Sequence, residues 1–332
     1  MNNLSKVFLT ILVFIQITSC TKPKTNEPAL ITPEPPKPDT LSSGWSKIKV
    51  NESLLSSSDV FFTSNTTGYF STSSNGTFKS VDGGNTWNQI YKANGDKLNA
   101  INIAATNDGK TFFCNSSAIF KTIDFGTTIT EYPFGGIGVS DVFFGDNNTG
   151  LSSTSTAGLF LTTNGGNSWN NISALPEINS NLFSTIFMLG NSNAWVCYGN
   201  KIYHSNGNLS SFKLDSVPNV ISNIGLISIF ATSTSVVYTC SYSGYLFKSV
   251  DGGNTFTFLT KLGVTNGFSD IHFIDSNTGY ISVGNRVYKT NNAGNTWNVI
   301  IALGNTSIIE IHFTDAAHGW ACCADGTVLK LN

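Results

Sequence analysis

The apolar residues of this 332-residue chain occur in short runs, and polar turns rich in Asn, Ser, Thr and Gly separate them. Runs of about four to eight residues with aromatic and β-branched side chains, bounded by such turns, are typical of β-strands. Charged residues make up only 11% of the chain, so these polar uncharged residues must cover much of the surface. The pattern predicts an all-β fold.

The strand pattern repeats with a period of about 41 residues. Four segments read almost alike, and they begin at Asp59, Asp141, Asp270 and Glu310. A full copy contains four apolar segments, and the last of them usually carries a Trp. A single four-stranded antiparallel sheet can bury its two faces only against similar neighbours. The repeat therefore predicts the blades of a β-propeller.

The two ends of the repeat region complement each other. The last copy stops at Asn332 without its fourth strand, and the segment 44–50 (GWSKIKV) resembles the missing strand, with Trp45 where other copies have a Trp. We therefore expect the first strand to complete the last blade and close the ring. Residues 44–332 hold about seven periods, so we predict a seven-bladed propeller of four-stranded antiparallel blades.

A turn of the form [ST]-x-[DN]-x-G-x-[ST]-[WF] follows the third apolar segment of most copies, and it is degenerate at 122–129 and 204–212. The Asp or Asn is expected to accept hydrogen bonds from its own turn, and the glycine to supply a positive φ. The Trp is expected to pack on its blade rather than to stack on a sugar. The residues to which we assign these structural roles are Asp82, Asp124, Asn164, Asp251, Asn292, Trp87, Trp169 and Trp297.

The turns SVDGGNTW, TTNGGNSW, SVDGGNTF and TNNAGNTW resemble the Asp-box, or BNR, motif. The whole repeat, with its D-x-x-F-x-D-x-x-x-G-Y/W opening, resembles the photosystem II stability/assembly factor-like family over residues 44–332. This resemblance implies a seven-bladed propeller and, more loosely, a scaffold that holds another protein. The Asp-box also occurs in sialidases, sortilins and xyloglucanases, so it says little about activity.

Arg286 is the only arginine of the chain, and this excludes several activities that the resemblance would suggest. Sialidases need three arginines to clamp the substrate carboxylate. Xyloglucanase-type enzymes place their aspartates across a cleft between two propellers, whereas this chain holds one. The arginine-rich surface of the photosynthetic assembly factors cannot be built either, so that role is not carried over. We predict no catalytic residue and no cofactor, and the net charge of -2 argues against a nucleic-acid partner.

The first residues have the features of an export signal. Residues 1–19 contain an apolar run that is too short to span a bilayer, and the ending ITSC resembles a bacterial lipobox, which implies a lipid on Cys20. An ordinary signal peptide with an incidental cysteine is the alternative. Residues 20–43 hold six of the nine prolines and are expected to form a tether. Thr21, which follows the cysteine, favours the outer membrane, with either a periplasmic or a surface location.

Two histidines and five further cysteines carry the remaining candidate chemistry. His272 and His312 occupy equivalent places, in DIHF and EIHF, where two other copies have Phe. We interpret them as packing residues, with a metal site as the alternative, although no third ligand is evident. Buried packing is also expected for the cysteines, with a strained disulfide between the last two as the alternative. These cysteines are Cys114, Cys197, Cys240, Cys322 and Cys323.

The connections between copies are longer and less repetitive than the copies themselves, which is typical of loops that carry function on a rigid scaffold. Aromatic residues and arginine dominate binding hot spots. The candidate contact residues are Tyr132, Phe134, Tyr198, Tyr242 and Arg286. Our leading hypothesis is a non-catalytic envelope lipoprotein that binds another envelope protein. The alternative is a carbohydrate-binding lipoprotein, and a glycoside hydrolase is less favoured.

Overall fold

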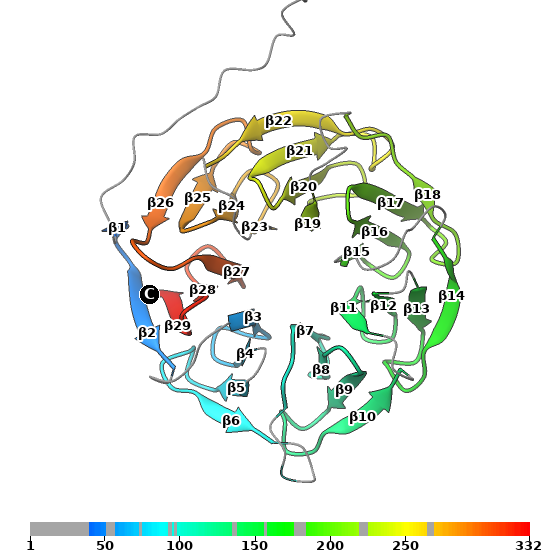
Figure 1. Ribbon diagram of the computed structural model, residues 1–332, viewed down its shortest axis with the longest axis horizontal. Helices are drawn as coiled ribbons and strands as arrows, with labels where there is room; N and C mark the ends of the chain where they lie inside the picture. Colours follow the sequence, from blue (N-terminus) through cyan, green and yellow to red (C-terminus); the bar gives the residue numbers. More distant parts are fainter. Residues whose placement is uncertain are drawn as a thin grey trace, which may run out of the picture. The chain divides into compact units, whose positions relative to one another are not determined.

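The computed structural model describes residues 40–50, 57–72, 75–91, 95, 98–134, 138–155, 158–175, 184–218, 225–263 and 269–332. All named elements in these ranges are β-strands, and they form seven antiparallel sheets arranged in a ring around a central channel (Figure 1). The prediction of a seven-bladed propeller is therefore confirmed. The signal segment 1–19 and Cys20 lie outside the described residues.

Each blade begins with its innermost strand at the channel and ends with its outermost strand at the rim. Blade 1 consists of β3 (Ser57–Phe62), β4 (Gly68–Thr72), β5 (Gly76–Ser80) and β6 (Asn88–Ile90), and blade 2 of β7 (Asn102–Ala105), β8 (Thr111–Cys114), β9 (Ala118–Thr122) and β10 (Thr130–Pro133). Blade 3 consists of β11 (Val139–Phe144), β12 (Gly150–Thr154), β13 (Gly158–Thr162) and β14 (Asn170–Ala174). Blade 4 consists of β15 (Ser184–Leu189), β16 (Asn193–Tyr198), β17 (Lys201–Asn206) and β18 (Lys213–Leu214).

The last three blades follow the same order, but blades 6 and 7 also use strands from the beginning of the chain. Blade 5 consists of β19 (Leu226–Ala231), β20 (Val237–Ser241), β21 (Tyr245–Ser249) and β22 (Thr257–Lys261). Blade 6 consists of β23 (Ser269–Phe273), β24 (Gly279–Val283), β25 (Arg286–Thr290) and β26 (Asn298–Ala302), with β1 (Thr40–Leu41) added. Blade 7 consists of β27 (Ile308–Phe313), β28 (Gly319–Cys323) and β29 (Thr327–Leu331), with β2 (Trp45–Lys49) as its outermost strand.

The ring closes as the sequence predicts. Strand β2 pairs antiparallel with β29, with Trp45 opposite Leu331 and Lys49 opposite Thr327. Trp45 is buried, and its ring packs edge-on against Phe313 with centroids 6.0 Å apart. The first and last segments of the propeller therefore belong to one sheet, and the ring cannot open without separating them.

The propeller begins slightly before the predicted boundary. Thr40 and Leu41, which the sequence places in the tether, form β1 and pair with Ala302 and Ile301 on the outer edge of blade 6. An outermost strand offers unpaired backbone groups on its free side, and a passing segment can satisfy some of them. This added edge strand is not visible in the repeat pattern because blade 6 alone receives it.

The core lies between the blades rather than within one sheet. At several junctions, an aromatic residue at the end of the innermost strand stacks on an aromatic residue from the second strand of the preceding blade. Both faces of each blade are apolar for this reason. The stacked pairs, with their centroid distances, are Phe62 on Trp320 (3.5 Å), Phe144 on Phe112 (4.0 Å), Phe273 on Tyr238 (4.3 Å) and Phe313 on Tyr280 (3.8 Å).

The propeller has two different faces. Since the strands run alternately up and down, the turns after the first and third strands lie on one face, which we call the box face. Backbone hydrogen bonds join these turns, as between Gly83 N and Thr66 O at 2.8 Å and between Gly165 N and Asn148 O at 2.9 Å. The hairpins between second and third strands and the connections between blades lie on the opposite face, which we call the crossing face. The part of the chain described by the structure contains no helix of the length and apolarity that a bilayer span requires.

Candidate functional site

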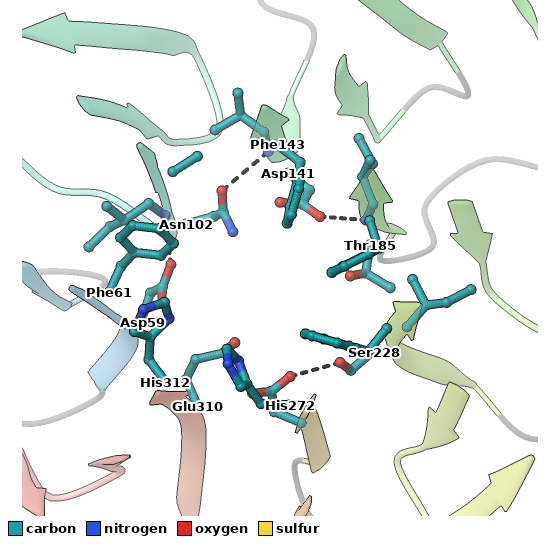
Figure 2. A pocket seen from close by; sticks show the side chains of 18 of the residues that line it. Asp59, Phe61, Asn102, Asp141, Phe143, Thr185, Ser228, His272, Glu310 and His312 are labelled. Carbon is teal, nitrogen blue, oxygen red and sulfur yellow. Dashed lines mark hydrogen bonds between the residues drawn. The ribbon is translucent and has the colours of Figure 1, made fainter. Parts of the chain in front are cut away.

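The innermost strands surround a cavity of about 310 Å³ at the ring axis (Figure 2). Side chains two residues apart on a strand point to the same side. Each innermost strand therefore presents two residues to the cavity, which form two layers around the axis. The polar layer consists of Asp59, Asn102, Asp141, Thr185, Ser228, Asp270 and Glu310. The second layer, the collar, consists of Phe61, Ala104, Phe143, Phe187, Phe230, His272 and His312.

The polar layer joins neighbouring blades. An oxygen of the polar-layer side chain accepts a hydrogen bond from a backbone N–H on the innermost strand of the next blade. The inner edge of that strand has no further strand beside it, so these N–H groups would otherwise be unpaired. The bonds of this kind are Ile103 N to Asp59 Oδ2 (2.6 Å), Val142 N to Asn102 Oδ1 (3.2 Å), Ile186 N to Asp141 Oδ2 (2.7 Å), Ile271 N to Ser228 Oγ (3.3 Å) and Ile311 N to Asp270 Oδ2 (3.2 Å).

The channel carboxyl groups have strongly altered proton affinity. Burial raises the pKa of Asp141 to about 7. Burial raises the pKa of Asp59 and of Glu310 well above their usual values, and the Glu310 carboxyl is also hydrogen-bonded to the carboxyl of Asp270. None of the described residues that line the cavity is a lysine or arginine. The described lining therefore offers these carboxyl groups no basic side chain as a partner.

The collar is a chain of rings in contact around the axis, and it is open at one place. Ala104 of blade 2 stands where the other six blades present Phe or His. The centroid distances between successive rings are 4.4 Å for Phe61 and His312, 5.3 Å for His312 and His272, 5.2 Å for His272 and Phe230, 4.5 Å for Phe230 and Phe187, and 5.1 Å for Phe187 and Phe143.

The two histidines are packed members of this collar. The Nε2 atom of His312 lies 3.0 Å from the carbonyl oxygen of Phe62, and His272 is hydrogen-bonded to the backbone of Phe313. Burial lowers the pKa of His272 to about 4 and that of His312 to about 3, so both rings are neutral near pH 7. The described ranges contain no group of three His, Cys, Asp or Glu side chains placed to hold a metal. These contacts support the packing interpretation.

The Asp and Asn residues of the repeated turns close their own turns. In the degenerate copy at 122–129, Asp124 Oδ1 accepts from Thr128 N at 2.8 Å, and Asp124 Oδ2 accepts from the Thr128 hydroxyl at 2.7 Å. These bonds lower the pKa of Asp124 to about 2. In the other turns, the equivalent backbone N–H groups donate hydrogen bonds to side-chain oxygens of Asp82, Asn164, Asp251 and Asn292. Each of these residues thus has the contacts of a structural role.

The three turn tryptophans also pack on their blades. Trp87 and Trp297 donate their indole N–H groups to Gly84 and Gly294 carbonyls at 3.0 and 2.9 Å. The Trp169 indole N–H is buried without a hydrogen-bond partner among the described residues, and the Trp169 ring lies 6.4 Å from that of Phe134. A cavity of about 360 Å³ opens here at the outer edge of blades 2 and 3. This rim groove is lined by Tyr132, Pro133, Phe134, Phe160, Ser168 and Trp169.

The predicted contact residues do not form one patch. Tyr132 and Phe134 share the rim groove, whereas Tyr242 is 41% exposed on a crossing-face hairpin of blade 5. Arg286 is half-buried at the start of β25 in blade 6. The prediction that Tyr198 is a contact residue is wrong, because it is 2% exposed and its hydroxyl donates to the Thr154 carbonyl. Tyr198 ends a strand whose last five residues are all buried, and repeat position alone did not reveal this.

The five cysteines of the propeller are buried and free, as expected from their position on second strands. Cys322 and Cys323 follow each other in β28 but form no disulfide. Burial raises the pKa of Cys197 and of Cys323 to about 12, so both remain thiols at neutral pH. These residues serve the packing of the blades.

Comparison with known proteins shows the fold but no family. No family model matches the chain, and no curated protein matches it. Among solved structures, YCF48 bound to a D1 peptide is 14% identical in sequence to this chain, with a TM-score of 0.69. The match covers 89% of this chain and 98% of the YCF48 chain. YCF48 from Cyanidioschyzon merolae is 16% identical with a TM-score of 0.68, covering 87% and 99%.

An enzyme shares the same architecture. The GH74 enzyme of Niastella koreensis is 16% identical with a TM-score of 0.68, and the match covers 88% of this chain and 53% of the enzyme. At these identities the likeness establishes a seven-bladed propeller and nothing about activity. The chemistry of the site must therefore be argued from the residues themselves.

Proposed function

We propose that this chain is a non-catalytic scaffold of the bacterial envelope that binds another protein, and that it is an Asp-box propeller of the assembly factor-like kind. The observation that carries the proposal is that acidic residues of the channel and of the repeated turns, which a hydrolase could use, already have structural partners. Asp59 and Asp141 join blades, and Asp124 and Asp251 close turns. YCF48, whose fold is similar, is bound to a D1 peptide in its structure, and this likeness supports a protein or peptide partner for the present chain.

The crossing face is the proposed binding surface. Its connections differ from blade to blade, whereas the turns of the box face repeat the same hydrogen bonds. Tyr242 projects from this face, and Tyr132 lies where β10 runs into a connection between blades. Tyrosine supplies a large contact area at low entropic cost, which suits such a surface.

Photo-crosslinking in native membranes tests the scaffold function. A photoreactive residue is placed at Tyr132 or Tyr242, and at Thr296 on the box face as the matched control. We expect one dominant protein adduct from the first two positions and none from Thr296, with mass spectrometry identifying the partner. No protein adduct at Tyr132 or Tyr242 from a folded variant, or equal adducts at all three positions, would count against the proposal.

Anchoring through Cys20 in the outer membrane is part of the same proposal. It is supported by the ITSC sequence and by the proline-rich segment that precedes the first strand. Replacing Cys20 with alanine should abolish incorporation of labelled palmitate and release the protein from the membrane fraction. Unchanged labelling and fractionation in the Cys20→Ala variant would exclude a lipid on this residue.

Carbohydrate binding is the second candidate, and the rim groove favours it. Aromatic rings stack on the apolar faces of sugars, and the groove combines the rings of Tyr132, Phe160 and Trp169 with the Ser168 hydroxyl. A glycan array is the direct test, with Tyr132→Ala as the variant that should lose the signal. An array without any specific signal would remove this function and leave the scaffold proposal intact.

A further inference from the structure

The aromatic layer of the collar lacks one ring, at Ala104. Blade 2 reads Asn102-Ile103-Ala104-Ala105, where blade 1 reads Asp59-Val60-Phe61-Phe62 in the same register. Ala104 is 4% exposed and lines the cavity of about 310 Å³. A buried apolar cavity of about 150 Å³ is enough to bind benzene. The channel therefore has room for one aromatic ring and a short substituent.

The gap also lies between two buried carboxyl groups. Blade 2 is flanked by blades 1 and 3, whose polar-layer residues are Asp59 and Asp141, and all three polar side chains face the cavity (Figure 2). Asp59 Oδ2 and Asp141 Oδ2 accept the backbone bonds described above. The described lining provides no lysine or arginine to pair with either carboxyl group. An ammonium group placed there would favour the ionised form of both carboxyl groups.

We propose that the gap at Ala104 binds a small arylalkylammonium compound. The aromatic ring takes the seventh place of the collar, between Phe61 and Phe143, where ring contacts at 4.5 to 7 Å are favourable. The ammonium group reaches the polar layer and donates hydrogen bonds to Asp59 and Asp141, because it has three donors and charge-assisted bonds are the stronger ones. This site is independent of protein binding at the crossing face.

Titration calorimetry on the full chain in detergent tests the site. The probe is 2-phenylethylamine, with 2-phenylethanol as the neutral analogue and butylamine as the analogue without a ring. We expect saturable binding of 2-phenylethylamine and binding at least about tenfold weaker for both analogues. No saturable binding of 2-phenylethylamine to the folded protein, or equal binding of all three compounds, would overturn the proposal.

Two variants locate the site. Ala104→Phe should abolish binding because it completes the collar, and six blades already carry an aromatic ring at this position. Asp141→Asn should lower the affinity for 2-phenylethylamine by about tenfold but leave the affinity for 2-phenylethanol unchanged. Its amide can keep the bond to Ile186, as the Asn102 amide does to Val142. Thermal unfolding verifies that both variants fold. Unchanged affinity for the amine in either folded variant would refute the assignment.

Discussion

At the scale of single residues, the box turns show how one backbone shape tolerates different side chains. Gly83 has a positive φ of 72°, and Phe125 and Ala293 hold the equivalent place with φ of 57°. A left-handed conformation is costly for such residues. At the turn of blade 2, a contact from blade 1 offsets part of this cost, since the Lys79 ammonium lies 5.1 Å from the centre of the Phe125 ring.

These turns share a side-chain oxygen of Asp or Asn that accepts a backbone hydrogen bond, and the loss of this oxygen should be measurable. Asp124→Ala removes the acceptor for Thr128 N and for the Thr128 hydroxyl. We expect the free energy of unfolding to fall by about 1 kcal/mol, as for the loss of a helix cap. Asp124→Asn is the matched control, because Asn164 makes the equivalent backbone bond. Chemical denaturation measures the free energy of unfolding of both variants. An equal loss of this free energy in Asp124→Ala and Asp124→Asn would mean that the hydrogen bond to the Thr128 backbone does not contribute to stability.

At the scale of strands, neighbouring blades are attached to each other at two radii, as at the junctions of blades 2 and 3 and of blades 5 and 6. Near the axis, the polar layer bonds to the following innermost strand. Further out, lysines of the third strands reach the box turns of the next blade, as Lys121 Nζ does to Gly165 O at 2.6 Å and Lys248 Nζ to Ala293 O at 3.2 Å. This explains why the third strand of several copies ends in Phe-Lys or Tyr-Lys. The repeated lysine is a connector between blades rather than a binding residue.

The inner attachment makes stability depend on pH in a defined direction. Asp141 has a pKa of about 7 in the folded chain against 3.8 for an ordinary Asp, so the folded state binds the proton more tightly. Its contribution to stability is present below pH 4 and is lost as the pH rises through 7. Urea denaturation at several pH values should show stability falling across this window, and falling less in Asp141→Asn. If the free energy of unfolding fell equally steeply with pH in the original protein and in Asp141→Asn, the raised pKa of Asp141 would be contradicted.

At the scale of the whole molecule, the ring depends on contacts between the two ends of the propeller. Strand β2 covers β29 and places Trp45 against Phe313. Blade 7 without β2 would expose a free strand edge and an apolar surface together. The architecture therefore places a strong stability requirement on a segment that precedes the first full repeat.

A pair of truncations tests this requirement. A chain that begins at residue 51 lacks β2, and we expect a large drop in the melting temperature together with aggregation through the exposed edge of β29. A chain that begins at residue 42 lacks only β1, so its melting temperature should change by at most a few degrees. Calorimetry and size-exclusion chromatography compare the two. Similar melting temperatures for both chains would show that ring closure contributes little.

The repeat by itself determined the architecture of this protein. The period of about 41 residues, the turn signature and the complementary segment 44–50 predicted seven blades and the closing strand, because these features are local in sequence and recur. The packed state of His272 and His312 was also favoured from their replacement of Phe at equivalent positions.

Only the tertiary structure decided which side chains meet. The burial of Tyr198, the rim groove at Tyr132 and Phe134, and the addition of β1 all depend on neighbouring strands or blades. The axial cavity beside Ala104 forms only when seven innermost strands converge on one axis. A repeat pattern specifies how one blade is built, whereas the channel and the grooves arise from differences between blades that are brought together in space.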